Sequence, residues 1–223
     1  MIDFQCCPKY GIDDYVRIVE LLRSEEGCPW DRAQTHESIK KNLIEEALEV
    51  TEAIDEKNAE HLLEELGDLM MQVVFHAQIE REQGSFDFDD VCDAACRKLL
   101  KRHPHVFGNV QVKDQTEALK VWEEAKRVEH KQETRLDAMK AVAKTLPATW
   151  QMEKLIKKSG DTCEDADTRL TAAAISAAGG DDESIGRLVL EAARLAAARG
   201  ADFEAIMLGA CKDYISSFES EQT

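Results

Sequence analysis

Hydrophobic residues recur along most of this chain with the spacing of an α-helix. Tyr15, Ile18, Val19 and Leu22 form one such stripe, and similar stripes run through residues 39–50 and 62–82. Alternating runs of Val, Ile or Thr, which would predict strands, are absent from the sequence. The pattern therefore predicts an all-α fold.

Local signals predict where several helices begin and end. Thr35 is a candidate N-cap for a long helix, and residues 55–58 predict the turn into the next one. Gly84 predicts the C-terminal cap of that second helix. Asp87 and Asp90 stand at the spacing of a capping box and predict the start of a further helix after residue 87.

Shorter or less regular segments complete the predicted order. Residues 27–31 predict a loop, and His103-Pro104 predicts the end of the helix that begins after Asp87. Another helix is predicted around residues 117–131 and a further one after Pro147. Beyond about residue 160 alanine becomes frequent, and glycines separate two or three more predicted helices.

Two acidic pairs stand at matching positions on the two long predicted helices. Glu46 and Glu49 are three residues apart and share a helix face, and Glu65 and Asp68 repeat this spacing. A short turn joins the helices as an antiparallel hairpin, so the pairs can face each other and offer four hard oxygen donors. Apolar residues flank both pairs, which favours carboxylates at a helix seam that need a cation. We therefore predict a Mg²⁺ site.

Two alternatives compete with this interpretation. Acidic pairs at this spacing are common on solvated helix faces, and one third of this chain is charged. A di-iron carboxylate bundle would require Glu-x-x-His on two helices, and no His of this chain stands three residues after a Glu. The spacing alone does not separate a metal site from a solvated face.

Composition limits the classes of partner. The chain carries 28 Lys and Arg against 45 Asp and Glu, a formal net charge of −17, which disfavours nucleic-acid binding. Apolar runs are too short for membrane spans, and the N-terminus lacks the order of a signal peptide. Seven irregularly spaced cysteines argue against a disulfide framework. We expect a cytoplasmic protein without nucleic-acid or membrane partners.

A few basic and aromatic residues are candidates for binding a phosphate-rich substrate. Lys98 and Arg102 lie near the end of one predicted helix, where they also suit the helix dipole. Trp30 and Trp122 could stack on a base, although Trp more often belongs to a core.

Taken in order, several motifs resemble those of bacterial MazG nucleoside triphosphate pyrophosphohydrolases over roughly residues 12–130. The motifs are Cys28-Pro-Trp-Asp31, Gln34-Thr-His36, Glu45-Glu46-x-x-Glu49, Glu65-Leu-Gly-Asp68-Leu, Gln72-Val-Val-Phe-His76-Ala and Arg102-His-Pro-His-Val-Phe-Gly108. The resemblance implies an all-α, MazG-like helical bundle that uses Mg²⁺ to hydrolyse nucleoside triphosphates to the monophosphate and pyrophosphate.

The resemblance also assigns roles to residues. It implies that Glu46, Glu49, Glu65 and Asp68 bind the metal and that Glu45 orients a water, which makes Glu45, Glu46 and Glu49 the catalytic candidates. It implies that Lys98, Arg102 and Trp122 contact phosphate and base, and Trp30 is a further candidate for the substrate site. The implied purpose is the removal of unwanted nucleotides. Helical hairpins of this kind bury their seams against a partner, so we expect a homodimer.

Some members of this family contain two copies of the domain, and the second half of this chain resembles a decayed copy. Aligning residues 170–176 with 43–49, and 183–188 with 64–69, replaces the four ligands by Ala173, Ser176, Ser184 and Arg187. We therefore predict a catalytic domain at residues 1–131 and a degenerate domain at 132–223. An unrelated Ala-rich helical tail is the alternative to a degenerate domain.

Two functional alternatives to an enzyme remain. One is a nucleotide-sensing or protein-binding module that keeps the fold, and the other is a purely structural helical protein.

Overall fold

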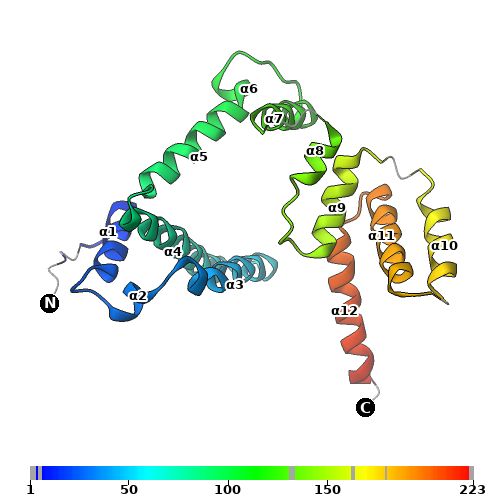
Figure 1. Cartoon of the computed structure of the whole chain (residues 1–223), viewed down its shortest axis with the longest axis horizontal. Coiled ribbons are helices and arrows are strands. Elements are labelled where there is room, and N and C mark those ends of the chain that lie inside the picture. The colour runs from blue at the N-terminus through cyan, green and yellow to red at the C-terminus, as the bar shows by residue number, and fades with distance from the viewer. Residues whose placement is uncertain (1–3, 5–6, 131–133, 162–163, 179, 221–223) are drawn as a thin grey trace. The chain divides into compact units, whose positions relative to one another are not determined.

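The computed structural model describes residues 4, 7–130, 134–161, 164–178 and 180–220, with side chains described up to Cys211. Every regular element within these ranges is a helix (Figure 1). The all-α prediction is confirmed. The chain divides into two compact units, Met1–Asn109 and Val110–Thr223.

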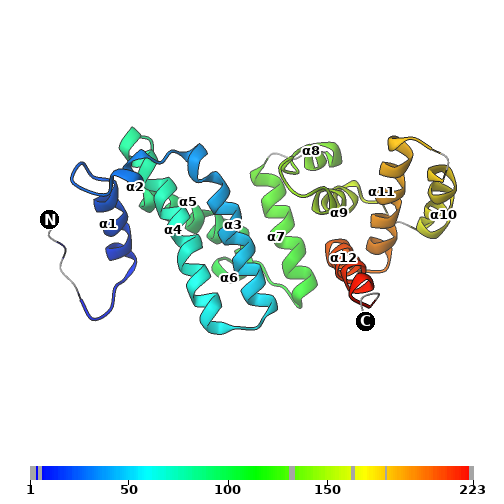
Figure 2. The ribbon, with the colours of Figure 1, turned by 90° about the horizontal axis from the view of Figure 1, so that it is seen from below.

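The first unit contains six helices. They are α1 (Ile12–Arg23), α2 (Pro29–Ala33), α3 (His36–Asp55), α4 (Ala59–Gln83), α5 (Phe88–Arg102) and α6 (Pro104–Phe107). The two long helices α3 and α4 lie side by side as an antiparallel hairpin (Figure 2). This hairpin carries both acidic pairs.

The boundary signals of the first unit act as predicted. The Thr35 hydroxyl caps α3 by accepting from the Ser38 amide at 3.3 Å, and Asn58 caps α4. Gly84 ends α4 with φ of 74°, a left-handed conformation that glycine adopts without strain. The Asp87 carboxylate accepts from the Asp90 amide at 3.1 Å as a capping box.

The predicted loop at residues 27–31 is wrong in part, because Pro29–Ala33 forms the short helix α2. Pro29 occupies the first turn of this helix, where its missing N–H costs nothing and its fixed φ is already helical. Similarly, Pro104 begins the one-turn helix α6 directly after α5 ends.

The core of the first unit joins α1, α3 and α4. Its buried members are Val19, Ile39, Val74, Phe75 and Ile79. Tyr15, Val16 and Phe88 pack against them. This apolar contact between α1 and α4 holds one side of the hairpin in place.

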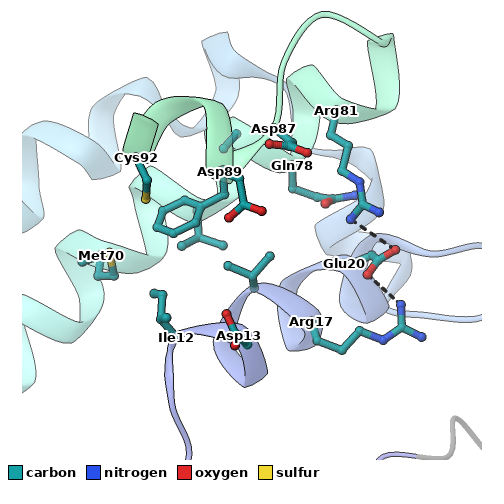
Figure 3. Close-up of a pocket in the computed structure, with 14 residues that line it drawn as sticks. Ile12, Asp13, Arg17, Glu20, Met70, Gln78, Arg81, Asp87, Asp89 and Cys92 are labelled. Atoms are coloured by element: carbon teal, nitrogen blue, oxygen red, sulfur yellow. Dashed lines mark hydrogen bonds and ion pairs between the residues drawn. The ribbon is translucent and has the colours of Figure 1, made fainter. Parts of the chain in front are cut away.

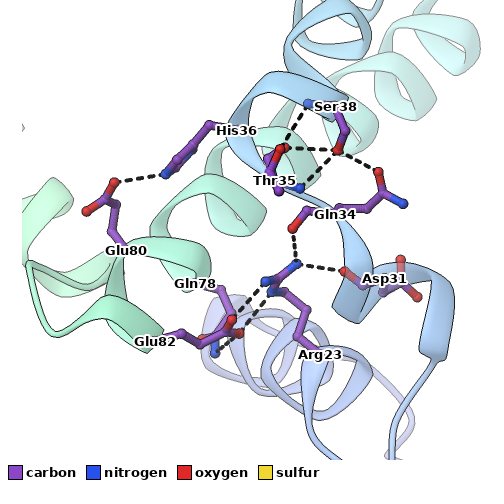
Figure 4. Close-up of polar contacts among 9 residues, drawn as sticks. All are labelled: Arg23, Asp31, Gln34, Thr35, His36, Ser38, Gln78, Glu80 and Glu82. Atoms are coloured by element: carbon purple, nitrogen blue, oxygen red, sulfur yellow. Dashed lines mark hydrogen bonds and ion pairs between the residues drawn. The ribbon is translucent and has the colours of Figure 1, made fainter.

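Arg23 fixes the segment between α1 and α3 (Figure 4). Its guanidinium makes two hydrogen bonds to the Glu82 carboxylate, at 2.9 and 2.8 Å. It also donates to the carbonyl oxygens of Asp31 and Gln34, and it lies 5.0 Å from the centre of the Phe75 ring. A nearly buried cation is thereby fully compensated, and α2 is tied to α1 and α4.

The second unit is also helical. It contains α7 (Gln115–Glu129), α8 (Arg135–Lys140), α9 (Ala148–Ser159), α10 (Ala166–Ala177), α11 (Asp182–Ala198) and α12 (Phe203–Ser220). Ile156, Ala166, Ala193, Ala196 and Phe203 form its core. The small alanine side chains let α10 and α11 pack closely as a second hairpin.

The domain boundary predicted between residues 131 and 132 falls outside the described residues. It would place α7 in the first domain, whereas the helix belongs to the second compact unit. The prediction of a decayed repeat concerns α10 and α11, and it remains a prediction.

Candidate metal centre

Three of the four predicted metal ligands come together on the α3–α4 hairpin. One carboxylate oxygen each from Glu46, Glu49 and Glu65 lies within 4.8 Å of the other two. Glu65 is nearly buried, with 9% of its surface exposed, and Glu46 is partly buried. Three hard oxygen donors at this separation suit a Mg²⁺-sized cation.

Asp68, the fourth predicted ligand, lies next to this group without belonging to it. Burial raises the pKa of Glu46, and the charges of Asp68, Glu49, Glu65 and Glu45 raise it further, in that order. Among the neighbouring carboxylates, Asp68 contributes most to this effect on Glu46. The site therefore gathers negative charge that a cation would neutralise.

Glu65 has a histidine partner that the sequence analysis missed. His61 Nε2 lies 3.1 Å from Glu65 Oε1, and His61 Nδ1 lies 3.0 Å from Glu56 Oε2. The hydrogen bond to Glu56 is the first cause that raises the pKa of His61. The spacing of His61 and Glu65, one helical turn apart, was the available signal.

Tyr15 connects α1 to the second acidic pair. Its hydroxyl donates a 2.9 Å hydrogen bond to the carbonyl oxygen of Gly67. Burial and then the charge of Asp68 raise the pKa of Tyr15. Tyr15 therefore remains a neutral donor beside Asp68.

The apolar surroundings expected for the carboxylates are only partly present within the chain. Val50 is buried, but Ala47 is exposed and Leu66 is 49% exposed. A Cβ added at Gly67 would meet no atom within 4 Å. The face of α4 beside Glu65 and Asp68 is therefore open in this chain.

The other predicted site residues lie in different environments. Glu45 is exposed on α3, next in sequence to Glu46. Lys98 is exposed on α5, and Arg102 is buried at the end of that helix. Trp30 on α2 is 63% exposed. Trp122 belongs to α7 in the second unit, with Lys126 Nζ 5.1 Å from the centre of its ring.

A second feature missed from the sequence is a histidine pair between α3 and α4. His36 Nδ1 and His76 Nδ1 are 2.7 Å apart. Figure 4 shows the second contact of His36, in which Nε2 lies 2.8 Å from Glu80 Oε1. Burial and then the neighbouring His36 lower the pKa of His76. One Nδ1 donates to the other, and this hydrogen bond ties the start of α3 to α4.

A separate cavity of about 560 Å³ lies among α1, α4 and α5 (Figure 3). Val16, Val74 and Phe88 form part of its apolar wall. Glu20 bridges Arg17 and Arg81 at its edge, at 2.6 and 3.3 Å. None of the four predicted metal ligands lines this cavity.

The residues aligned with the ligands in the second unit occupy the α10–α11 hairpin. Ala173 is buried on α10, and Arg187 on α11 pairs with Glu183 at 3.2 Å. Gly186, aligned with Gly67, also faces open space. Among the described residues, one group of His, Cys, Asp or Glu side chains has the spacing of a metal site. It consists of Glu46, Glu49 and Glu65.

None of the helices that the structure describes is both long and apolar enough to cross a membrane.

Part of the chain is similar to known proteins. The family model of the MazG nucleotide pyrophosphohydrolase domain matches residues 34–107, which contain α3, α4 and α5. The nucleoside triphosphate pyrophosphohydrolase/pyrophosphatase MazG of Thermotoga maritima is 60% identical over 97 residues, 44% of this chain and 38% of that protein. The nucleoside triphosphate pyrophosphohydrolase of Escherichia coli K12 is 41% identical over 148 residues, 66% of this chain and 56% of that protein.

The protein YabN of Bacillus subtilis is 46% identical over 140 residues, 63% of this chain and 28% of that protein. The chain thus spans between 28% and 56% of the length of these three relatives. The matched domain contains all four predicted metal ligands. Residues 34–107 of the chain therefore form a MazG nucleotide pyrophosphohydrolase domain.

Proposed function

We propose that this chain is a Mg²⁺-dependent nucleoside triphosphate pyrophosphohydrolase that releases a nucleoside monophosphate and pyrophosphate. The observation that carries the proposal is the close approach of Glu46, Glu49 and Glu65 on one hairpin of the MazG domain. Two of the relatives bear the name of this activity.

The residues fit a hard divalent cation. All donors are carboxylate oxygens, the ligand type that Mg²⁺ prefers. Burial, and after it the charges of the neighbouring carboxylates, raises the pKa of Glu46, and a cation at this position would offset both effects. We assign Glu46, Glu49, Glu65 and Asp68 as the ligands.

The bound Mg²⁺ would polarise the phosphate chain and offset its charge. Glu45, exposed beside Glu46, would accept a proton from the attacking water and orient it. Hydrolysis breaks a P–O bond of the bridge between the α- and β-phosphoryl groups. One product keeps the bridging oxygen, and the oxygen of the attacking water completes the other product. His61 and Tyr15 hold Glu65 and the backbone beside Asp68 in place.

Substrate contacts follow from the same proposal. Lys98 and Arg102 would neutralise phosphate oxygens, since both are cations on α5. Trp30 and Trp122 would stack on the base. The exposed ring of Trp30 on α2 is positioned by the Arg23 hydrogen bonds to Asp31 and Gln34.

We further propose a homodimer formed through the α3–α4 hairpin. An apolar stripe on this hairpin is exposed in the single chain, namely Ile44, Leu48, Leu63, Leu66, Met70 and Val73. Gly67 lies within the stripe and has free space above it, although glycine in a helix costs about 1 kcal/mol relative to alanine. A second copy packing closely at Gly67 would explain both features.

The second unit would then be a degenerate copy that keeps helical packing and has lost the metal ligands. Gly186 with open space above it supports this relation to Gly67. The cellular role would be removal of unwanted nucleotides in the cytoplasm. The second unit would contribute to dimerisation or act as a scaffold.

A pyrophosphate-release assay tests the activity. Canonical and modified nucleoside triphosphates are incubated with the chain, with Mg²⁺ and with EDTA. We expect stoichiometric pyrophosphate and monophosphate only with Mg²⁺. Mg²⁺-dependent nucleotide binding without pyrophosphate release would instead identify a nucleotide-sensing module.

A further inference from the structure

Two histidines and a glutamate connect the start of α3 to the last turns of α4. His36 is the first residue of α3, and its Nδ1 lies 2.7 Å from Nδ1 of His76. Its other nitrogen, Nε2, lies 2.8 Å from Oε1 of Glu80 (Figure 4). The two imidazole rings are stacked, with their planes 6° apart and their centres separated by 5.0 Å. All three residues belong to the first compact unit.

The partners of the ring nitrogens decide where the hydrogens lie. An ionised carboxylate only accepts hydrogen bonds, so Nε2 of His36 carries a hydrogen and donates it to Glu80. In neutral His36 the Nδ1 atom is then the acceptor, and Nδ1 of His76 is the donor. Nε2 of neutral His76 therefore carries a lone pair. This buried atom has no hydrogen-bond partner among the residues that the structure describes.

An additional proton cannot enter this arrangement without a cost. If it adds to His76, its hydrogen lies on the buried Nε2, which has no acceptor. If it adds to Nδ1 of His36, His76 must accept from that atom and move its own hydrogen to the same buried Nε2. When both rings are charged, both Nδ1 atoms carry hydrogens, so the 2.7 Å contact is lost and the stacked cations repel each other.

Other charged groups lie on the open side of the pair. A cavity of about 440 Å³ borders His36, and its charged walls are formed by Arg23 of α1, Glu37 of α3 and Glu82 of α4. Arg23 and Glu82 form an ion pair at 2.8 Å and balance each other. Glu37 is exposed, as is Lys40 one turn further along α3, so water screens both charges. Glu80 is therefore the main counter-charge for this pair.

We propose that His36, His76 and Glu80 form a pH-sensitive latch, which holds the start of α3 against α4 at neutral pH and releases it in mild acid. The latch closes one end of the α3–α4 hairpin, and the turn after Asp55 closes the other. The carboxylates of the candidate metal centre lie between these two ends. Release would loosen the hairpin that carries them, and this consequence rests on the proposed function, whereas the latch does not.

The direction of the pH effect follows from His76. Burial, and then the charge of His36, lowers the pKa of His76 below its ordinary value of 6.5. A group of this kind contributes stability that is present above its unfolded-state pKa and is lost as the pH falls through its folded-state pKa. Each proton that only the released form binds raises the released population by up to about tenfold per pH unit. Acid therefore opens the latch.

Hydrogen exchange of the full chain in EDTA, followed from about pH 7 to about pH 5, tests the latch. Correction for the intrinsic effect of pH on exchange leaves the protection factor of each amide. We expect protection at the start of α3, beginning with the Ile39 amide that donates to the Thr35 carbonyl, to fall about tenfold across this range. Amides after Val50, at the other end of α3, are the internal reference and should change less.

Two variants remove the titrating groups. His76→Gln retains a side-chain donor toward His36 and cannot gain a proton, so protection at the start of α3 should no longer depend on pH. His36→Gln removes the other ring at a less buried position and should have the same effect, which provides a second variant if the first does not fold. The matched control is His130→Gln, at an exposed histidine of the second unit, and it should keep the pH dependence.

Two results would overturn the latch. One is protection that falls equally along the whole of α3 in the unchanged chain. The other is a fall at the start of α3 that persists in both histidine variants. A chain that shows the pH-dependent release yet hydrolyses no nucleoside triphosphate retains the latch and loses the proposed function. A chain that hydrolyses nucleoside triphosphates without this release loses the latch alone.

Discussion

The Nε2 atom of His61 lies 3.1 Å from Oε1 of Glu65, one turn further along α4. Hydrogen bonds to a ligating carboxylate fix its orientation, and removing them commonly lowers metal affinity 10- to 100-fold. We expect His61→Ala to weaken Mn²⁺ binding, measured by calorimetry, by about tenfold. His61→Gln, which retains a donor, should recover part of the loss.

The direction in which His61→Ala changes the Mn²⁺ affinity distinguishes two roles of His61. A cationic imidazole that merely competed with the metal for Glu65 would give tighter Mn²⁺ binding in His61→Ala. Such a result would rule out the positioning role of His61. The same histidine contacts Glu56, so Glu56→Gln serves as a control that leaves the Glu65 contact intact.

Glu49→Gln and Asp68→Asn should abolish hydrolysis, because each removes a charged donor from the proposed metal site. We expect at least about a 100-fold loss of kcat/KM, which corresponds to about 3 kcal/mol of transition-state stabilisation. Circular dichroism should show little change in helicity. A well-folded double variant that remains active would refute the assigned ligands.

The contribution of Glu46 to the stability of the metal-free chain should decrease as the pH rises above about 4.5. Burial and the surrounding carboxylates raise the pKa of Glu46 above its ordinary value of 4.5, so the folded chain holds a proton that the unfolded chain has released. The stability contributed by this proton is therefore lost as pH rises through the folded-state pKa. Thermal melts in EDTA across this range test the effect.

The variant Glu46→Gln separates the contribution of Glu46 to the pH dependence of stability from the contributions of other titratable groups. The variant should melt higher than the unchanged chain at neutral pH in EDTA, because it removes the repelled charge. With Mg²⁺ the order should reverse, since only the unchanged chain gains a ligand-linked increase in Tm. Identical pH profiles for the two proteins in EDTA would contradict the argument.

Arg23→Met should destabilise the first unit. The change leaves the carbonyl oxygens of Asp31 and Gln34, and the carboxylate of Glu82, without their donor. Removing one partner of a fully buried ion pair costs about 3–5 kcal/mol, and we expect about 2–3 because Glu82 is partly exposed. Urea unfolding measures the loss, with Arg17→Met as the exposed control.

Leu63→Glu/Leu66→Glu should convert a dimer into a monomer. Both leucines are exposed on α4 of the single chain, and a carboxylate in a packed interface would lack a partner. Analytical ultracentrifugation measures the change. Leu136→Glu, at an exposed leucine of α8, should leave the assembly intact.

Helix boundaries were predictable where a single residue decides the local conformation. Thr35, Gly84 and Asp87 act through their own hydroxyl, missing Cβ or carboxylate, so the signal lies in the sequence itself. The helix at Pro29 was missed because a proline can equally begin a helix or sit in a turn.

The boundary between the two compact units was harder to predict from the sequence than the helix boundaries were. The predicted boundary followed the end of the motif set, whereas α7 belongs with the helices that follow it. Which helices pack together depends on the fit of complete surfaces, and a periodic stripe on α7 does not specify its partner.

The sequence by itself determined the all-α architecture, the hairpin of α3 and α4, and the placement of two acidic pairs on it, because helical periodicity and short-turn geometry are local properties. Tertiary structure alone decided that Glu46, Glu49 and Glu65 converge, and that His36 of α3 meets His76 and Glu80 of α4. These distances depend on how helices rotate and pack against one another, which spacing along one helix does not encode.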